Sequence, residues 1–218
     1  MRIPHTPEIL LALRSPTPEE PLRILVSGCL AGMGCGVNGT DYGLGVVLRD
    51  LLSVGAVRAF PYCPEEVGLG TPRTLPDIHG GDGHDVLDGR ARVLDEHGTD
   101  LTDGMVAGAR GMLAFALSNR VELAILTDMS AACGTQVISD GCRLVEHRRF
   151  RAGVGVAAAL LLRNAIAVVS QRDPRSIGIL REKIEPGFRH DPVAVDYHES
   201  SWYVRQFGAA GAPPQSET

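Results

Sequence analysis

Four short apolar segments, separated by segments with helical periodicity, constrain the fold of this chain more than any other feature. Apolar residues rich in branched side chains occupy 22–27, 57–62, 121–126 and 165–170, and such runs are typical of strands buried on both faces. Between them, apolar residues recur with helical spacing or, at 154–163, form a nearly uninterrupted run, as in helices that pack against a core. Strands that alternate with helices predict an α/β fold in which helices cover both faces of a mostly parallel sheet.

The sequence divides into three parts around this predicted sheet. Residues 1–21 contain repeated prolines, which interrupt regular elements, and are expected to form an extension. Residues 22–170 form the main domain. Residues 171–218 are expected to add a C-terminal helix and a polar tail, with the helix burying Ile177, Leu180 and Ile184.

Within the main domain, the pattern predicts further elements between the strands. Helices are expected at 44–52 and from Thr102 or Asp103 onward, and residues 67–103 are expected to be mostly loop, a candidate lid. The Asp-Gly pair in 137–145 predicts a hairpin. The side chains expected to be buried by the second helix are Val106, Ala109, Leu113 and Leu117.

Charge and hydrophobicity argue against a general nucleic-acid binder and against a membrane protein, although a local basic patch stays open. The net charge of -5, from 26 acidic and 21 basic side chains, gives no general attraction for nucleic acid or anionic lipid. The apolar run at 154–162 is far shorter than the roughly 20 residues of a membrane-spanning helix, and the run at 9–13 is too brief for the core of a signal peptide. A cytoplasmic protein is expected, in which the five cysteines act as ligands, nucleophiles or buried thiols rather than disulfides.

Three of the cysteines follow predicted strands. Cys29 and Cys63 lie directly after the first two strands, and Cys133 lies just beyond the third. Because parallel strands end at the same edge of a sheet, the fold should bring these thiols together. Thiolates bind soft metals and iron–sulfur clusters, but a structural zinc site usually contains cysteine pairs separated by two to four residues, and none occurs here. The spacing alone leaves a metal or cluster site and three buried thiols as alternatives.

Several ordered motifs around these cysteines resemble those of the thiouracil desulfidase (TudS-like) family, over about residues 22–170. A family motif Ser-Ala-Cys-Leu-x-Gly is similar to 27–32, Cys-Pro-Glu is similar to 63–65, and Ser-Pro-Ser-Cys-Gly is similar to 130–134. Further matching positions are Gly68, Leu69, Thr71, Pro72, Arg73, Gly80, Gly81, Asp82, Gly83, Asp140, Gly141, Gly153 and Gly155.

The resemblance implies a Rossmann-like three-layer fold that carries a [4Fe-4S] cluster on Cys29, Cys63 and Cys133, with one iron not ligated by the protein. It implies an enzyme that replaces the sulfur of a thiolated pyrimidine, or of a related small thiocarbonyl compound, by oxygen and releases sulfide without net redox change. An open iron is a Lewis acid that takes up the leaving sulfur. Glu65 is then the expected general acid or base, and Ser130 is expected to orient water or substrate.

Departures from the family pattern leave the substrate open. Residues 36–39 read Gly-Val-Asn-Gly where the family has Arg-Tyr-Asp-Gly, and Thr127 replaces a common lysine. Fewer positive charges argue against a thiolated tRNA substrate without excluding it. Two other functions remain alternatives: an iron–sulfur sensor or sulfur carrier without turnover, and a cluster-free hydrolase with a nucleophilic Cys29 or Cys133.

Other polar residues have structural and functional interpretations. Cys35 is either a fourth or exchangeable ligand or a thiol outside the cluster, and the structural alternative for Glu65 is to cap a loop or pair with Arg73. Cys142 is interpreted as a packed thiol. A hydrated loop, rather than a second metal site, is the interpretation for His79, Asp82, His84 and Asp85. The sequence makes no prediction of the oligomeric state.

Overall fold

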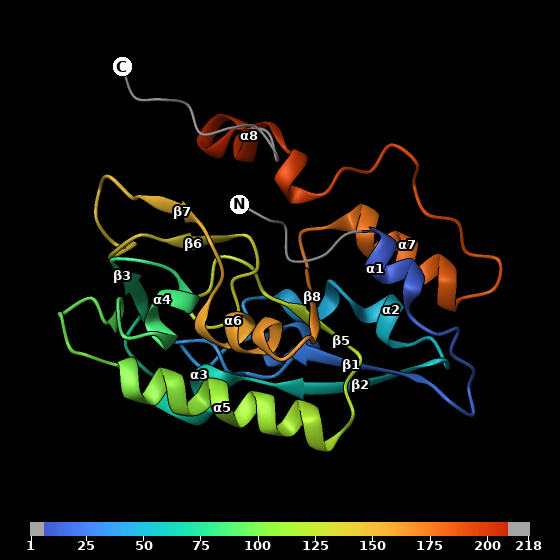
Figure 1. Ribbon diagram of the computed structural model, residues 1–218, viewed down its shortest axis with the longest axis horizontal. Helices are drawn as coiled ribbons and strands as arrows, with labels where there is room; N and C mark the ends of the chain where they lie inside the picture. The colour runs from blue at the N-terminus through green and yellow to red at the C-terminus, as the bar shows by residue number, and fades with distance from the viewer. Residues whose placement is uncertain (1–6, 209–218) are drawn as a thin grey trace.

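The computed structural model describes residues 7–208 and has an α/β, Rossmann-like three-layer fold (Figure 1). Its main sheet contains four parallel strands in the order β2-β1-β5-β8, which confirms the predicted fold class. Each strand coincides with a predicted apolar segment, although the last two begin two residues later than expected. The strands are β1 (Leu22–Ser27), β2 (Val57–Tyr62), β5 (Leu123–Leu126) and β8 (Ala167–Ser170).

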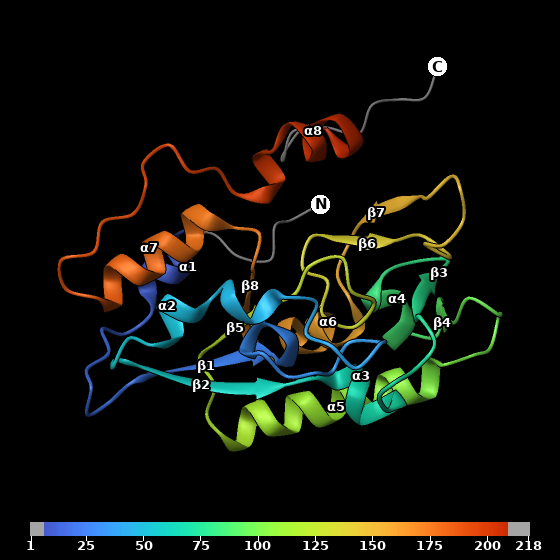
Figure 2. The same cartoon turned by 180° about the vertical axis from the view of Figure 1, so that it is seen from behind.

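Alternate side chains of the central strands enter two separate cores. Ile24 and Ile125 pack with helices α1 (Pro7–Ala12), α2 (Arg49–Leu52) and α7 (Pro174–Ile184). Neighbouring side chains, among them Leu25 and Leu126, pack on the opposite face against α5 (Thr102–Ser118) and α6 (Val156–Arg163). Figures 1 and 2 show α5 and α7 on opposite sides of the sheet. Burial on both faces explains why these strands are apolar at nearly every position.

The short helix α3 (Pro64–Leu69) approaches α5 so closely that glycines are required at the contact. A Cβ on Gly108 would overlap the carbonyl oxygen of Pro64, and one on Gly68 would overlap that of Gly104. Because Cys63 is the N-cap of α3, this contact also determines where that thiol lies.

Replacing Gly108 by alanine should destabilise the protein by about 1–3 kcal/mol, because the added methyl group has no space between the two backbones. This cost exceeds the roughly 0.5–1 kcal/mol by which alanine favours a helix over glycine. Gly55→Ala is the matched control, since a Cβ at Gly55 would meet no atom within 4 Å. Urea unfolding of the variants measures the difference, and equal stability of the two would contradict the close packing.

Two small antiparallel sheets flank the main sheet, and they correct two expectations. Residues 67–103 are not mostly loop: they contain the end of α3, the paired strands β3 (Asp77–His79) and β4 (Arg92–Leu94), and α4 (Gly83–Leu87). The predicted hairpin is wider than 137–145, because β6 (Val137–Ser139) pairs with β7 (Phe150–Ala152). Ile78, Val86 and Val93 are buried, so core contacts hold a segment whose glycines and aspartates suggested a loop.

The terminal segments also differ from expectation. The prolines after residue 6 do not prevent α1, because Pro7 occupies its first position and Leu10 is completely buried. The C-terminal segment contains α8 (Ser201–Phe207) and the 3-10 turn η3 (Tyr197–Glu199), which were not predicted, in addition to the predicted α7. Residues 1–6 of the predicted extension and 209–218 of the predicted tail lie outside the described residues. The division into three parts stays a prediction.

Two predicted helices have different details. The helix expected at 44–52 is split into a 3-10 turn, η2 (Leu44–Val46), and α2. Helix α5 begins at Thr102 but buries Met105, Met112 and Ala116, whereas Leu117 is 57% exposed. The prediction of the buried face of α5 from its leucines and valines was therefore wrong in part. No helix within residues 7–208 has the length and hydrophobicity needed to cross a membrane.

Candidate functional site

A cavity of about 310 Å³ lies at the carboxyl edge of the main sheet. Residues that follow all four strands line it: Cys29 after β1, Cys63 after β2, Thr127 after β5, and Gln171 and Arg172 after β8. Ligand sites of open parallel sheets form at this edge, where the loops after the strands meet. The fold thus places residues from distant parts of the sequence around one space large enough for a pyrimidine-sized ligand.

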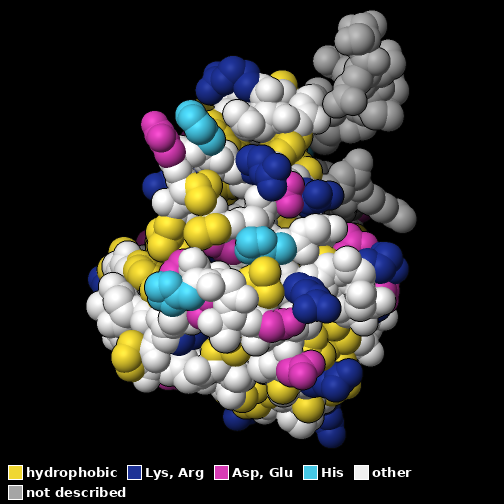
Figure 3. All heavy atoms as spheres, turned by 90° about the vertical axis from the view of Figure 1, so that its left-hand side faces the viewer, with side chains coloured by type: hydrophobic (Ala, Val, Ile, Leu, Met, Phe, Trp, Pro, Cys, Tyr) yellow, Lys and Arg dark blue, Asp and Glu magenta, His cyan; other side chains and the backbone are white. Residues whose placement is uncertain are grey.

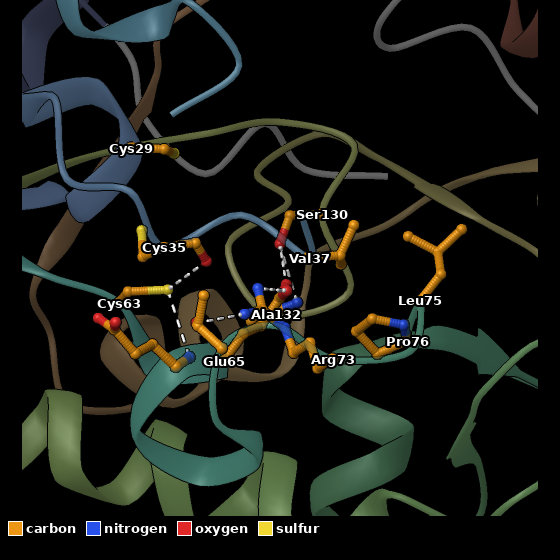
Figure 4. Close-up of polar contacts among 12 residues, drawn as sticks. Cys29, Cys35, Val37, Cys63, Glu65, Arg73, Leu75, Pro76, Ser130 and Ala132 are labelled. Atoms are coloured by element: carbon orange, nitrogen blue, oxygen red, sulfur yellow. Dashed lines mark hydrogen bonds and ion pairs between the residues drawn. The ribbon is translucent and has the colours of Figure 1, made fainter. Parts of the chain in front are cut away.

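Four of the five cysteines line this cavity, including the three predicted to converge. Cys35 lies between Cys29 and Cys63 (Figure 4) and is only 2% exposed. Gly28, which replaces the alanine of the family motif, leaves room for it: a Cβ there would lie 3.1 Å from the Cys35 sulfur. Cys133 reaches the cavity from the loop after β5 and is 6% exposed. The sequence predicted that Cys29, Cys63 and Cys133 lie together, but it left the position of Cys35 relative to them open.

Hydrogen bonds at the sulfur atoms separate the thiols into two kinds. A hydrogen bond with Cys35 lowers the pKa of Cys29 to about 7 and also lowers the pKa of Cys63. The Thr127 hydroxyl lies 3.0 Å from the Cys29 sulfur, and the Glu66 amide donates to the Cys63 sulfur over 3.4 Å. The same contacts raise the pKa of Cys35, and burial raises that of Cys133. Cys29 and Cys63 are therefore the thiols most readily converted to thiolates, the form that binds metals.

The donor set of the cavity fits an iron–sulfur cluster. Its lining combines four thiols with no histidine among the described residues, and thiolates are the usual ligands of such clusters. Cys29, Cys63 and Cys133 come from three different loops, as the resemblance implied. Cys35 adds a further sulfur beside two of them.

Glu65 and Ser130, the predicted catalytic residues, are joined by a direct hydrogen bond. The Ser130 hydroxyl donates to Glu65 Oε1 over 2.8 Å and accepts the backbone amides of Ala132 and Cys133 at 3.1 and 2.9 Å (Figure 4). Arg73 forms an ion pair of 2.6 Å with Glu65 Oε2, and both side chains are largely buried. The pairing of Glu65 with Arg73 that was an alternative interpretation is therefore present. Ser130 connects this pair to the loop that carries Cys133.

The cavity contains residues that the sequence reasoning did not assign to the site, Gln171 and Arg172 after β8 among them. The sequence could have predicted these two residues as part of the site, because they follow the fourth predicted strand just as the cysteines follow the other three. Thr127 was noted only as a departure from the family, yet it contacts Cys29.

The interpretation of His79, Asp82, His84 and Asp85 as a hydrated loop is wrong: His79 lies in β3, the other three lie at the start of α4, and all four are partly buried. Asp82 caps α4, Asp85 pairs with Arg90, and His84 contacts Arg163. Cys142 lies outside the cavity, in a second pocket that His79 also lines.

Comparisons with known proteins agree with this architecture. The family model described as 2-thiouracil desulfurase matches residues 24–173. The uncharacterized protein YbbK of Bacillus subtilis (strain 168) is 36% identical over 155 residues, which cover 71% of this chain and 99% of that protein. The solved structure of a [4Fe-4S]-dependent thiouracil desulfidase, TudS, matches with a TM-score of 0.56 and 32% identity, covering 68% of this chain and 90% of that chain. Cys29, Cys63 and Cys133 all lie within the region matched by the family model.

Proposed function

This chain belongs to the 2-thiouracil desulfurase family, and from that premise we propose that it is an iron–sulfur-dependent desulfidase. Its substrate is a thiolated pyrimidine or a related small thiocarbonyl compound, whose sulfur it replaces by oxygen. Cys29, Cys63 and Cys133 would hold a [4Fe-4S] cluster with one iron free of protein ligands. The observation that carries the proposal is the convergence of these thiols in one cavity beside the linked Glu65 and Ser130.

The protein residues have separate tasks in this proposal. The cluster, when bound, supplies an iron that acts as a Lewis acid toward the substrate sulfur. Arg73 holds Glu65 Oε2, and Oε1, which accepts the Ser130 hydroxyl, keeps a second lone pair for proton exchange with water or a ring nitrogen. Ser130 orients Oε1 and, through the Cys133 amide, ties it to the loop of a proposed ligand.

The proposed reaction needs no electron donor. Water supplies the oxygen of the new carbonyl group, and its two hydrogens leave with the sulfur as hydrogen sulfide, so no atom changes its oxidation state. Besides the cluster, the proposed reaction therefore requires only a group that accepts and donates protons, and the Glu65 carboxylate is such a group.

A small substrate suits the cavity better than a polynucleotide. The cavity volume of about 310 Å³ is at the lower end of the range for small-molecule sites. The face seen in Figure 3 mixes basic, acidic and apolar side chains and has no continuous basic patch.

The decisive experiment measures iron, acid-labile sulfide and turnover on protein reconstituted without oxygen. We expect about four iron and four sulfide per chain, as in one [4Fe-4S] cluster, and stoichiometric uracil and sulfide from 2-thiouracil. A cluster without sulfide release from thiouracil, its nucleoside or thiolated tRNA would favour a sensor or carrier. Sulfide release that survives removal of iron by a chelator would favour a cysteine hydrolase.

A further inference from the structure

Arg172 is the cavity arginine whose charge has no acidic partner within residues 7–208. The other two arginines of the lining are neutralised, Arg73 by Glu65 and Arg143 by Asp77, each at 2.6 Å. Arg172 follows β8, and its backbone amide donates to Ser170 at the end of that strand. Arg172 is an exposed residue at the border of the cavity, and its guanidinium presents several hydrogen-bond donors that no described carboxylate neutralises.

One aromatic residue of the C-terminal segment contacts this side chain, and a second aromatic residue stacks with the first. The Arg172 guanidinium lies over the ring of Tyr197, 4.9 Å from its centroid. The ring of Tyr197 also stacks with that of Trp202, with 5.8 Å between the ring centroids and an interplanar angle of 13°. Trp202 also packs against Phe150 of β7 and Phe207 of α8. A cation over such a stack is attracted by the ring and loses rotational freedom.

The turn that carries Tyr197 is fixed to the core next to Arg172. The Tyr197 amide donates to Asp173 over 3.0 Å, and Asp173 is completely buried. Asp196 accepts the amide and hydroxyl of Ser176 near the start of α7. Arg175 donates to the Ala194 carbonyl, which precedes the turn, and to Glu199, its last residue. Tyr197 is therefore held in a defined position relative to the end of β8.

We propose that Arg172 binds the ligand of the cavity and that Tyr197 and Trp202 position it for this task. Its target is a hydrogen-bond acceptor, either a carbonyl oxygen of the ring or an anionic substituent. Tyr197 and Trp202 lie beyond residue 173, where the family match ends. The identity of the ligand as a pyrimidine rests on the proposed function.

The test compares ligand affinity of the cluster-loaded protein in four forms: wild type, Arg172→Met, Tyr197→Leu and Tyr197→Phe. Calorimetric titrations use uracil, the product of the proposed reaction, and orotate, which adds a carboxylate to the same ring. We expect Arg172→Met and Tyr197→Leu to weaken binding about tenfold, as for loss of a hydrogen bond to a charged group. Tyr197→Phe keeps the ring but removes the hydroxyl that hydrogen-bonds to the Arg172 side chain, so it should weaken binding less than Tyr197→Leu does.

Comparing uracil with orotate shows whether Arg172 binds a ring carbonyl or an anionic substituent. Equal losses for uracil and orotate indicate a ring carbonyl, and a larger loss for orotate indicates an anionic substituent. In steady-state kinetics the Arg172→Met variant should raise KM with little change in kcat, which a general loss of folded protein would not produce. Trp202 is the single tryptophan of the chain, so its emission reports whether Tyr197→Leu disturbs the stack.

Wild-type affinity in Arg172→Met would overturn the proposal. So would weak binding in Tyr197→Leu together with unchanged binding in Arg172→Met, because Tyr197 would then act without the guanidinium. Wild-type protein that binds neither uracil nor orotate would also overturn it. Protein that releases no sulfide from thiouracil, but still loses uracil affinity on Arg172→Met, would refute the proposed function and support this binding site.

Discussion

Replacing Cys63 by alanine is expected to abolish both iron binding and sulfide release. Cys63 lies where β2 ends and α3 begins, and its sulfur accepts the Glu66 amide. The remaining cluster ligands would come from only two loops, and thiolate ligation is what holds such a cluster in a protein. Iron per chain should fall from about four to near zero, measured together with the visible absorption of the cluster after reconstitution without oxygen.

Two other cysteines serve as matched controls for this variant. Cys142→Ala removes a thiol outside the cavity and should leave iron and turnover unchanged. Cys35→Ala removes a buried thiol inside the cavity and should retain the cluster if Cys29, Cys63 and Cys133 are the ligands. Full iron content in Cys63→Ala would contradict the ligand assignment, and loss of iron in Cys35→Ala would add Cys35 to it.

Glu65→Gln is expected to retain the cluster and lower turnover by about 10²- to 10⁴-fold, the usual contribution of a general acid or base. Glutamine keeps the shape of the side chain but cannot exchange a proton. It also removes the charge that pairs with Arg73 over 2.6 Å, and an unpaired buried charge destabilises a protein. The rate, the iron content and the thermal midpoint are therefore measured on the same preparation.

Arg73→Gln separates the two possible functions of Glu65. It breaks the same ion pair but leaves the carboxylate in the cavity, so it should lower the thermal midpoint as Glu65→Gln does and keep more turnover. Glu146→Gln changes an exposed carboxylate and should alter neither quantity. Equal loss of turnover in Glu65→Gln and Arg73→Gln would assign Glu65 a structural role.

Elements with strong periodicity were predicted well, and elements stabilised by distant contacts were not. The strands of the main sheet are apolar on both faces, so a short window of sequence is enough to find them. The pairing of β6 with β7 joins residues on either side of a ten-residue loop that contains Arg148 and Arg149, and the nearest Asp-Gly turn signal was misleading. Likewise, Met105 and Met112 face the core where Leu117 was expected.

The sequence by itself determined the parallel sheet and the convergence of Cys29, Cys63 and Cys133. Apolar runs predict buried strands, and parallel strands end at a common edge. Only the tertiary structure decided that Cys35 lies between two of these thiols, that Glu65 bonds to Ser130, and that Tyr197 holds Arg172. Each of these contacts joins side chains from separate segments. The positions of such side chains depend on how the whole chain packs, and no local pattern of residues predicts that packing.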